Sequence, residues 1–276
     1  KGKLAPHALV MSATPIPRTM ALVLYGDLDV SVVDELPPGR KEVRTRIVSE
    51  KKRQDMYGFI QRAVEAGQQA YVVCPLVEDS EMMDATSAAQ TVQEMRKAMP
   101  DVRIELLHGR MKSEEKDRIL QGFAAHESDV LVSTTVIEVG VNVPNATIMV
   151  IEDAERFGLA QLHQLRGRVG RGDQQSWCFL MADPSERMKT MASTTDGFVI
   201  ARKDLELRGP GELMGSRQSG MLDEKILRLA SDGPLMDKVT KAVDAIFAQP
   251  KAEENRQLMV YARRMMEQRG LFVARN

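Results

Sequence analysis

The feature that most constrains the fold is a regular alternation, between residues 42 and 182, of short apolar runs with longer helical stretches. The apolar runs have the length and composition of buried strands and lie at residues 43–48, 70–76, 103–107, 130–133, 147–151 and 177–181. Helical stretches between them include residues 51–66, closed by Gly67, and residues 113–123, with two glutamates in the first turn. This alternation predicts an α/β fold with a parallel sheet covered by helices on both faces.

Polar residues follow two of the predicted strands. His108-Gly109-Arg110 comes after residues 103–107 and leads to a helix start at Ser113, and Thr134 and Thr135 follow residues 130–133. Arginine, hydroxyl groups and helix amino termini all suit phosphate, and binding sites of open α/β sheets collect beyond the carboxyl ends of the strands. We therefore expect functional residues at that edge, although a local hydrogen-bonding histidine and a turn rich in Thr and Gly are the simpler alternatives.

Residues 166–172 contain three arginines and three glycines and follow an apolar helical stretch. Arginine is always charged and presents a planar fork of donors to phosphate oxygens, while glycine lets the backbone approach a bulky anion. A basic turn that merely stays solvated is the alternative. For an arbitrary Arg-Gly run that alternative would be favoured, but this run has the spacing Gln-x-x-Gly-Arg-x-Gly-Arg, from Gln164 to Arg171.

Composition limits the class of protein without choosing a function. The 276 residues are 43% hydrophobic and 28% charged, an ordinary globular balance. The formal net charge of −1 means that a nucleic-acid surface would have to be local; the basic cluster at residues 40–53 is interpreted as a solvated face. The two cysteines lie in apolar runs and predict buried thiols, and the four scattered histidines predict no metal site. No membrane-spanning run or signal peptide is evident, so we expect a cytoplasmic protein.

The motif at residues 164–171 resembles the last conserved motif of superfamily 2 helicases. This resemblance implies that Arg168 and Arg171 act as arginine fingers on ATP held by a preceding lobe, with Gln164 beside the nucleotide. By the same resemblance, Ser12 and Thr14 belong to the motif that couples ATP hydrolysis to movement.

Residues 133–144 resemble the motif that lies between nucleotide and nucleic acid in the same superfamily. The resemblance implies that Thr134 and Thr135 face the DNA backbone, that Gly140 and Asn142 approach the ribose, and that His108 and Arg110 contact backbone phosphate. Many relatives carry Asp where Asn142 stands. The amide keeps the hydrogen bond but not the charge.

Residues 25–31, 34–41 and 204–220 narrow the resemblance to the RecG family. The last of these stretches resembles the translocation hairpin that RecG shares with the transcription-repair coupling family Mfd, and implies that Arg208 and Gln218 link ATP turnover to duplex movement. Two apparent ligand-binding motifs are rejected. No strand precedes Gly209-x-Gly211, so a dinucleotide site is excluded, and Asp34-Glu35 lies on the wrong side of the Ser-Ala-Thr motif to bind magnesium.

The resemblance implies four parts: the end of a first RecA-like lobe (1–33), a second RecA-like lobe (34–182), a translocation helical hairpin (183–222) and a helical tail (223–276). No Gly-x-x-x-x-Gly-Lys-Ser/Thr cradle occurs, so ATP and Mg²⁺ are expected to bind mainly to a first lobe outside this sequence, and the isolated chain is expected to be inactive.

The implied activity is that of an ATP-dependent motor that moves along double-stranded DNA as a monomer. It would regress stalled replication forks and migrate branched junctions in recombination and repair. An Mfd-type translocase and a non-catalytic nucleic-acid-binding module are the alternatives. The presence of both Arg168 and Arg171 favours the motor.

Overall fold

The computed structural model describes Leu9, Met11, Ser31, Val33 and residues 40–75, 81–134, 143–208, 233–249 and 252–268. Six of the predicted functional residues, Ser12, Thr14, Thr135, Gly140, Asn142 and Gln218, lie outside the described residues. The described residues fall into two compact units, one that ends at Leu207 and one that begins at Arg208. The boundary expected at residue 182 remains a prediction.

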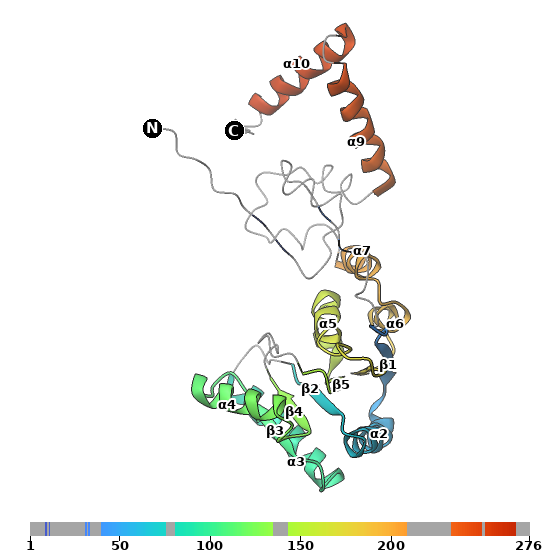
Figure 1. Cartoon of the computed structure of the whole chain (residues 1–276). Coiled ribbons are helices and arrows are strands. Elements are labelled where there is room, and N and C mark those ends of the chain that lie inside the picture. Colours follow the sequence, from blue (N-terminus) through green and yellow to red (C-terminus); the bar gives the residue numbers. More distant parts are fainter. Residues whose placement is uncertain are drawn as a thin grey trace. The chain divides into compact units, whose positions relative to one another are not determined.

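The first unit is built on a six-stranded, wholly parallel sheet (Figure 1). Its strands are β1 (Arg44–Val48), β2 (Gln69–Val73), β3 (Ile104–Leu107), β4 (Val130–Ser133), β5 (Ala146–Ile151) and β6 (Trp177–Met181). Their order across the sheet is β1-β6-β5-β2-β4-β3. All six predicted strands are confirmed. The largest difference is at β2, which ends at Val73 rather than at residue 76.

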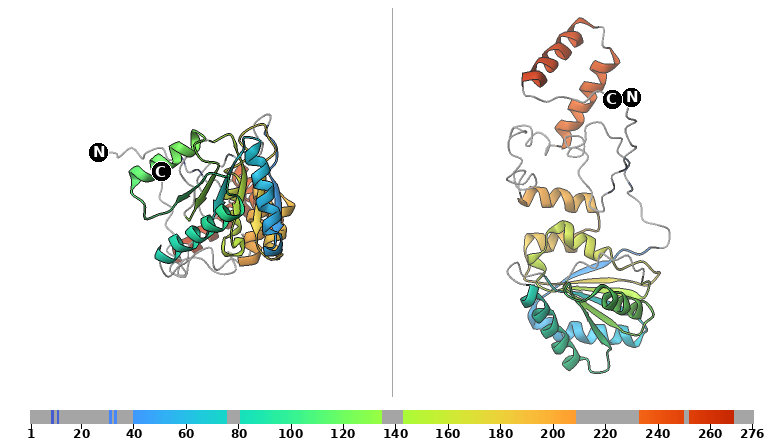
Figure 2. Two further views of the ribbon diagram at one scale, coloured as in Figure 1. Left: turned by 90° about the horizontal axis from the view of Figure 1, so that it is seen from below. Right: turned by 90° about the vertical axis from the view of Figure 1, so that its left-hand side faces the viewer.

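Helices cover both faces of this sheet, as the alternating pattern predicts (Figure 2). On one face, α2 (Arg53–Glu65) and α3 (Glu81–Ala98) pack against alternate strand residues such as Val72 and Val150. On the other face, α4 (Ser113–Ala124), α5 (Leu159–Arg166), α6 (Glu186–Ser193) and α7 (Gly197–Arg208) contribute to a second cluster that contains Tyr71 and Met149. Successive strand side chains point to opposite faces, so each central strand supplies both cores.

Local signals account for the helix ends. A 3-10 turn, η1 (Glu50–Lys52), precedes α2, and Gly67 closes it with a φ of 81°, a left-handed conformation that glycine adopts at low cost. Another turn, η2 (Ala154–Arg156), follows β5, and the Gln161 side chain accepts a hydrogen bond from the Gly158 N–H to fix the start of α5. The loop from β5 therefore enters α5 in a defined direction.

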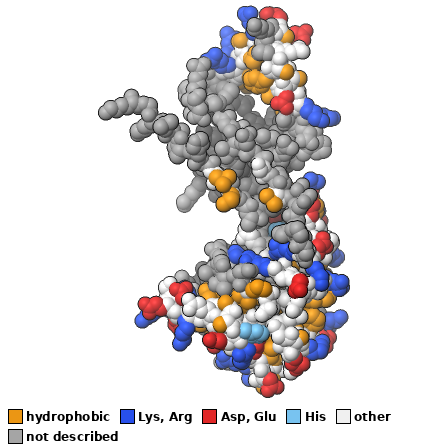
Figure 3. Space-filling view, viewed as in Figure 1, with side chains coloured by type: hydrophobic (Ala, Val, Ile, Leu, Met, Phe, Trp, Pro, Cys, Tyr) orange, Lys and Arg blue, Asp and Glu red, His pale blue; other side chains and the backbone are white. Residues whose placement is uncertain are grey.

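The second unit contains two described helices, α9 (Gly233–Ala248) and α10 (Glu253–Gln268). Both are amphipathic, as the Met and Leu spacing predicts. Large apolar side chains remain exposed on them, and hydrophobic surface is visible on this part in Figure 3; examples are Val239, Val243, Phe247, Leu258 and Tyr261. No helix among the described residues is both long and apolar enough to cross a membrane.

Candidate functional site

The arginine-rich turn lies at the amino edge of the sheet. Gly170 has a φ of 77°, and a Cβ atom there would lie 2.8 Å from Val43 Cγ2, next to the start of β1. A Cβ atom at Gly172 would lie 3.1 Å from the carbonyl oxygen of Pro144, just before β5. A Cβ atom at Gly170 would clash with the Val43 side chain, and one at Gly172 would be tight against the Pro144 carbonyl oxygen, so both positions favour glycine. The expectation that the unusual residues gather at the carboxyl edge is therefore wrong for this turn: α5 carries the chain back across the sheet before the turn begins.

Arg166 anchors the turn from inside the protein. Its guanidinium donates to the Met191 and Thr194 carbonyl oxygens, both at 2.8 Å, and to Thr45 Oγ1 of β1 at 3.3 Å. Only 3% of the residue is exposed, and this burial lowers the pKa of Arg166, which nevertheless stays charged because an arginine pKa begins so high. Arg166 thus joins the end of α5 to β1 and to the end of α6.

His163 completes this anchor. Its Nδ1 lies 3.0 Å from an Arg166 guanidinium nitrogen. Burial lowers the pKa of His163, and the charge of Arg166 lowers it further, so a neutral ring that accepts from the guanidinium is favoured at neutral pH. The sequence offered a signal for this role: Arg166 lies four residues after Leu162 and seven after Leu159, which places it on the buried face of α5.

The two predicted arginine fingers are less buried than Arg166. Arg168 is half-buried, Arg171 is exposed, and the predicted nucleotide contact Gln164 is half-buried on α5. Both finger guanidinium groups act on the hydroxyl of Tyr71 in β2: burial raises the pKa of Tyr71 to about 12, and the charges of Arg171 and Arg168 oppose that rise. The two predicted fingers are therefore more accessible than Arg166.

The predicted DNA contacts lie at the opposite, carboxyl edge. His108 follows β3, Arg110 is exposed, and the Lys116 ammonium of α4 holds the Gly109 carbonyl oxygen at 2.6 Å. Thr134 follows β4, where its N–H donates to the Leu107 carbonyl oxygen at 3.3 Å. Thr134 is only 3% exposed, so its hydroxyl does not face outward as the exposed Arg110 does.

The chain between β4 and β5 links the two edges. Because both strands run parallel, the segment that leaves β4 at Thr134 has to return to the amino edge at Pro144, beside Gly172. Residues 135–142, which include the predicted ribose contacts Gly140 and Asn142, lie outside the described residues. The described residue before them, Thr134, lies beside the predicted DNA contacts, and Pro144, just after them, lies beside the arginine turn.

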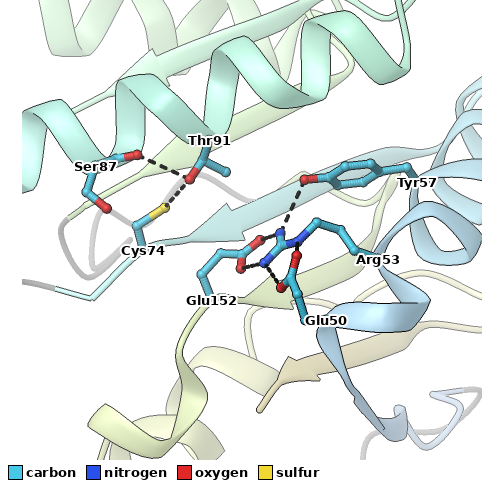
Figure 4. Close-up of polar contacts among 7 residues, drawn as sticks. All are labelled: Glu50, Arg53, Tyr57, Cys74, Ser87, Thr91 and Glu152. Atoms are coloured by element: carbon cyan, nitrogen blue, oxygen red, sulfur yellow. Dashed lines mark hydrogen bonds and ion pairs between the residues drawn. The ribbon is translucent and has the colours of Figure 1, made fainter.

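The sequence did not predict a cluster of polar side chains around Arg53 at the carboxyl edge (Figure 4). Arg53, at the start of α2, forms a bidentate pair with Glu152 after β5, at 2.7 and 2.9 Å, and also binds Glu50 and the Tyr57 hydroxyl. Burial alone would lower the pKa of Arg53, but the hydrogen bonds to Glu50 and Glu152 outweigh it and raise the pKa. Because Glu152 is 99 residues away, no local pattern identifies this pair.

The remaining surface carries mixed charge. Lys and Arg side chains are interspersed with Asp and Glu over the face of the sheet unit shown in Figure 3. The basic stretch that begins at Arg40 is mostly exposed, as a solvated face would be, except for Arg40 itself and Arg53. Within the part of the chain that the structure describes, no three His, Cys, Asp or Glu side chains form a group able to hold a metal ion.

Comparison with known proteins identifies the two parts of the chain. Residues 51–173 match the profile of the helicase conserved C-terminal domain, and residues 194–273 match that of ATP-dependent DNA helicase RecG, domain 3, C-terminal. The chain is 51% identical over 240 residues to the ATP-dependent DNA helicase RecG of Acidithiobacillus ferridurans, which covers 85% of the chain and 35% of that relative. It is 50% identical over 249 residues to RecG of Pasteurella multocida, a match that covers 87% of this chain and 36% of that relative.

The chain belongs to the RecG family. It corresponds to the carboxyl-terminal part of RecG and spans about a third of the length of the curated relatives it matches. A solved structure of RecG bound to a three-way DNA junction is 48% identical and covers 80% of this chain and 30% of that one, with a TM-score of 0.64. The RecA-like assignment of the sheet is thereby confirmed, and an Mfd-type protein is not favoured.

Proposed function

We propose that this chain is the carboxyl-terminal motor portion of an ATP-dependent translocase that moves on double-stranded DNA, regresses stalled forks and migrates branched junctions. Relatives about half identical to it are named ATP-dependent DNA helicases, and the RecG structure with a TM-score of 0.64 holds a three-way junction. The observation that carries the proposal is the difference in burial within the arginine turn. Arg166 is buried and anchors the turn, whereas Arg168 is half-buried and Arg171 is exposed.

In this proposal the nucleotide site is shared with a first lobe. Arg168 and Arg171 reach the γ-phosphate of ATP held there, and their positive charge offsets the negative charge that spreads over the phosphate oxygens in the transition state. Gln164, Gly140 and Asn142 complete the contacts to the nucleotide. The ligands of Mg²⁺ are assigned to the first lobe, because no Gly-x-x-x-x-Gly-Lys-Ser/Thr cradle occurs in this sequence.

The DNA site in this proposal occupies the carboxyl edge. Arg110 and the Gly109 backbone contact a strand of the duplex through phosphate oxygens, which position DNA without reading its sequence. Thr134, which is only 3% exposed, and Thr135 are proposed to contact the same DNA backbone, as the resemblance implies. Ser12, Thr14, Gln218 and Arg208, the last residue of α7, are proposed to couple the two sites. The monomeric state is part of the same proposal.

The test is Arg168→Ala in the full-length protein that contains this chain. The account predicts that DNA-stimulated ATP hydrolysis falls by ~10³-fold, because a finger acts on the transition state, while DNA affinity stays within about twofold of wild type. Rates are measured with a coupled ATPase assay and affinity by fluorescence anisotropy on a labelled fork. Unchanged hydrolysis would favour a non-catalytic nucleic-acid-binding module, and equal loss of hydrolysis and affinity would indicate a role in folding.

A further inference from the structure

Arg40, just before β1, contacts the arginine-rich turn at the amino edge of the sheet. Its Nε donates to the Gly170 carbonyl oxygen at 2.8 Å, and one of its terminal nitrogens lies 3.5 Å from the Gly167 carbonyl oxygen. The partners are 130 and 127 residues away in sequence. The two carbonyl groups lie on either side of Arg168, so one guanidinium spans the backbone that carries a proposed finger.

The residues next to Arg40 hold the same region. We call residues 40–44 the strap. The Gln175 side chain donates to the Glu42 carbonyl oxygen at 2.9 Å, the Thr195 hydroxyl donates to the Glu42 carboxylate at 3.2 Å, and the Arg44 N–H donates to the Ser176 carbonyl oxygen at 3.0 Å. The strap therefore also binds the chain on the far side of the turn, both just before β6 and just after α6.

The geometry of the turn explains why it needs this support. Gly170 has a left-handed φ and lies against the strap residue Val43 with no space for a Cβ. Two glycines flank Arg168 and Val169, and glycine backbone loses more conformational entropy on ordering than any other residue. A planar guanidinium can donate to two carbonyl oxygens at once and lock the backbone between them, which a lysine ammonium does less well.

We propose that Arg40 is a positioning residue for the finger arginines. It holds the Gly167–Gly170 backbone in the conformation from which Arg168 and Arg171 meet the transition state, without itself touching the nucleotide. This inference rests on the proposed function, since it has meaning only if the turn completes an ATP site. Preorganised donors lower the barrier because they need not reorient during the reaction, and a misplacement of about 1 Å can cost about 10²-fold in rate.

The first experiment compares Arg40→Gln with Arg46→Gln in the full-length protein. Arg46 is exposed on β1 and, among the described residues, makes no contact with the turn, so its replacement removes the same charge from the same basic stretch. Arg40→Gln should lower the DNA-stimulated kcat by about 10- to 100-fold, with KM for ATP and DNA affinity within about twofold of wild type. The kcat of Arg40→Lys should lie between those of Arg40→Gln and wild type, and the kcat of Arg46→Gln should equal that of wild type.

A double-mutant cycle then separates positioning from folding. If Arg40 acts through the finger arginines, Arg40→Gln causes a smaller loss of kcat in the Arg168→Ala background than in wild type, because only Arg171 remains to be positioned, whereas independent effects multiply. A full additional loss in the double variant, or an unchanged kcat in Arg40→Gln, overturns the assignment. Equal loss for Arg46→Gln overturns it too, because the effect would be one of charge alone.

The outcomes for the two proposals are distinguishable. If Arg168→Ala itself leaves hydrolysis intact, the proposed function fails first. If Arg168→Ala abolishes hydrolysis and Arg40→Gln does not reduce it, only the positioning role fails. Folding of the same variants is checked in the 276-residue chain, whose single tryptophan, Trp177, packs edge-on against Phe59 in the sheet unit, so that its fluorescence should match wild type.

Discussion

The two edges of the sheet use arginine in different ways. At the carboxyl edge, Arg53 binds the carboxylates of Glu152 and Glu50, and these hydrogen bonds raise its pKa. At the amino edge, Arg166 and Arg40 donate to main-chain carbonyl oxygens around the arginine turn, and burial lowers the pKa of Arg166.

This difference has a physical consequence. A carboxylate partner cancels the charge of an arginine, whereas carbonyl partners satisfy its N–H groups and leave the positive charge in place. At the amino edge the hydrogen-bond acceptors of Arg166 and Arg40 are thus mainly uncharged, and the Glu42 carboxylate of the strap is the nearby negative charge that acts on Arg166. The cluster of Arg53 and Glu152 instead connects α2 to the end of β5 and serves the fold.

Replacement of the buried anchor tests the amino edge most strongly. Arg166→Ala should lower the free energy of unfolding of the sheet unit by about 3 kcal/mol, because it leaves the Met191 and Thr194 carbonyl oxygens buried without their donor. Urea unfolding of the isolated chain, followed by Trp177 fluorescence, measures the change. Arg168→Ala is the matched control and should stay within about 0.5 kcal/mol of wild type. Equal stability of the two variants would remove the distinction between anchor and finger.

The carboxyl edge is tested by Glu152→Gln. The substitution leaves Arg53 largely buried with only the more exposed Glu50 as a charged partner, and should cost about 2 kcal/mol of stability. The control is Glu186→Gln, which breaks a surface ion pair with Lys203 and should not shift the unfolding midpoint. If Glu152→Gln changed ATP hydrolysis but not stability, the cluster would belong to the site and not to the fold.

The two buried thiols report on the two edges separately at alkaline pH. Burial raises the pKa of Cys74, which follows β2, and of Cys178, near the start of β6, to about 12. A raised folded-state pKa means that the unfolded chain loses the proton first, so this stability is present below about pH 9 and declines between about pH 9 and 12.

The expected decline is about 1.4 kcal/mol per pH unit for each thiol. The measurement is the free energy of unfolding of wild type, Cys74→Ala and Cys178→Ala at a series of pH values from 8 to 10.5. Each variant should show a shallower slope than wild type. A wild-type slope in either variant would mean that the thiol at that edge is not kept from solvent.

The sequence was sufficient for the strands and for the type of fold, because the apolar runs are long enough to be buried on both faces. The ends of β4 and β6 were predicted correctly, while β2 stops earlier because the apolar run of residues 70–76 continues past the last ladder pair at Val73. The order of the strands could not be predicted. It depends on which helices cross the sheet in each direction, and periodicity carries no information about that choice.

The motif singled out the arginine turn as a candidate site, but it did not predict where the turn lies in the fold. Sequence spacing showed that Arg168 and Arg171 lie together, whereas their position at the amino edge follows from the contacts of Gly170 with Val43 and of Gly172 with Pro144. The roles of Arg40 and Arg53 depend on partners about 100 residues away or more, so both were interpreted as part of a solvated basic stretch.

The central claim, that Arg168 acts on the transition state of ATP hydrolysis, is tested most directly by its effect on a transition-state mimic. The measurement is the affinity of the full-length Arg168→Ala variant, with DNA present, for ADP–aluminium fluoride and for a non-hydrolysable ATP analogue. The account predicts that affinity for the mimic falls by ~10²-fold or more while affinity for the analogue stays near wild type. If the variant bound the mimic as tightly as wild type does, the claim would be contradicted.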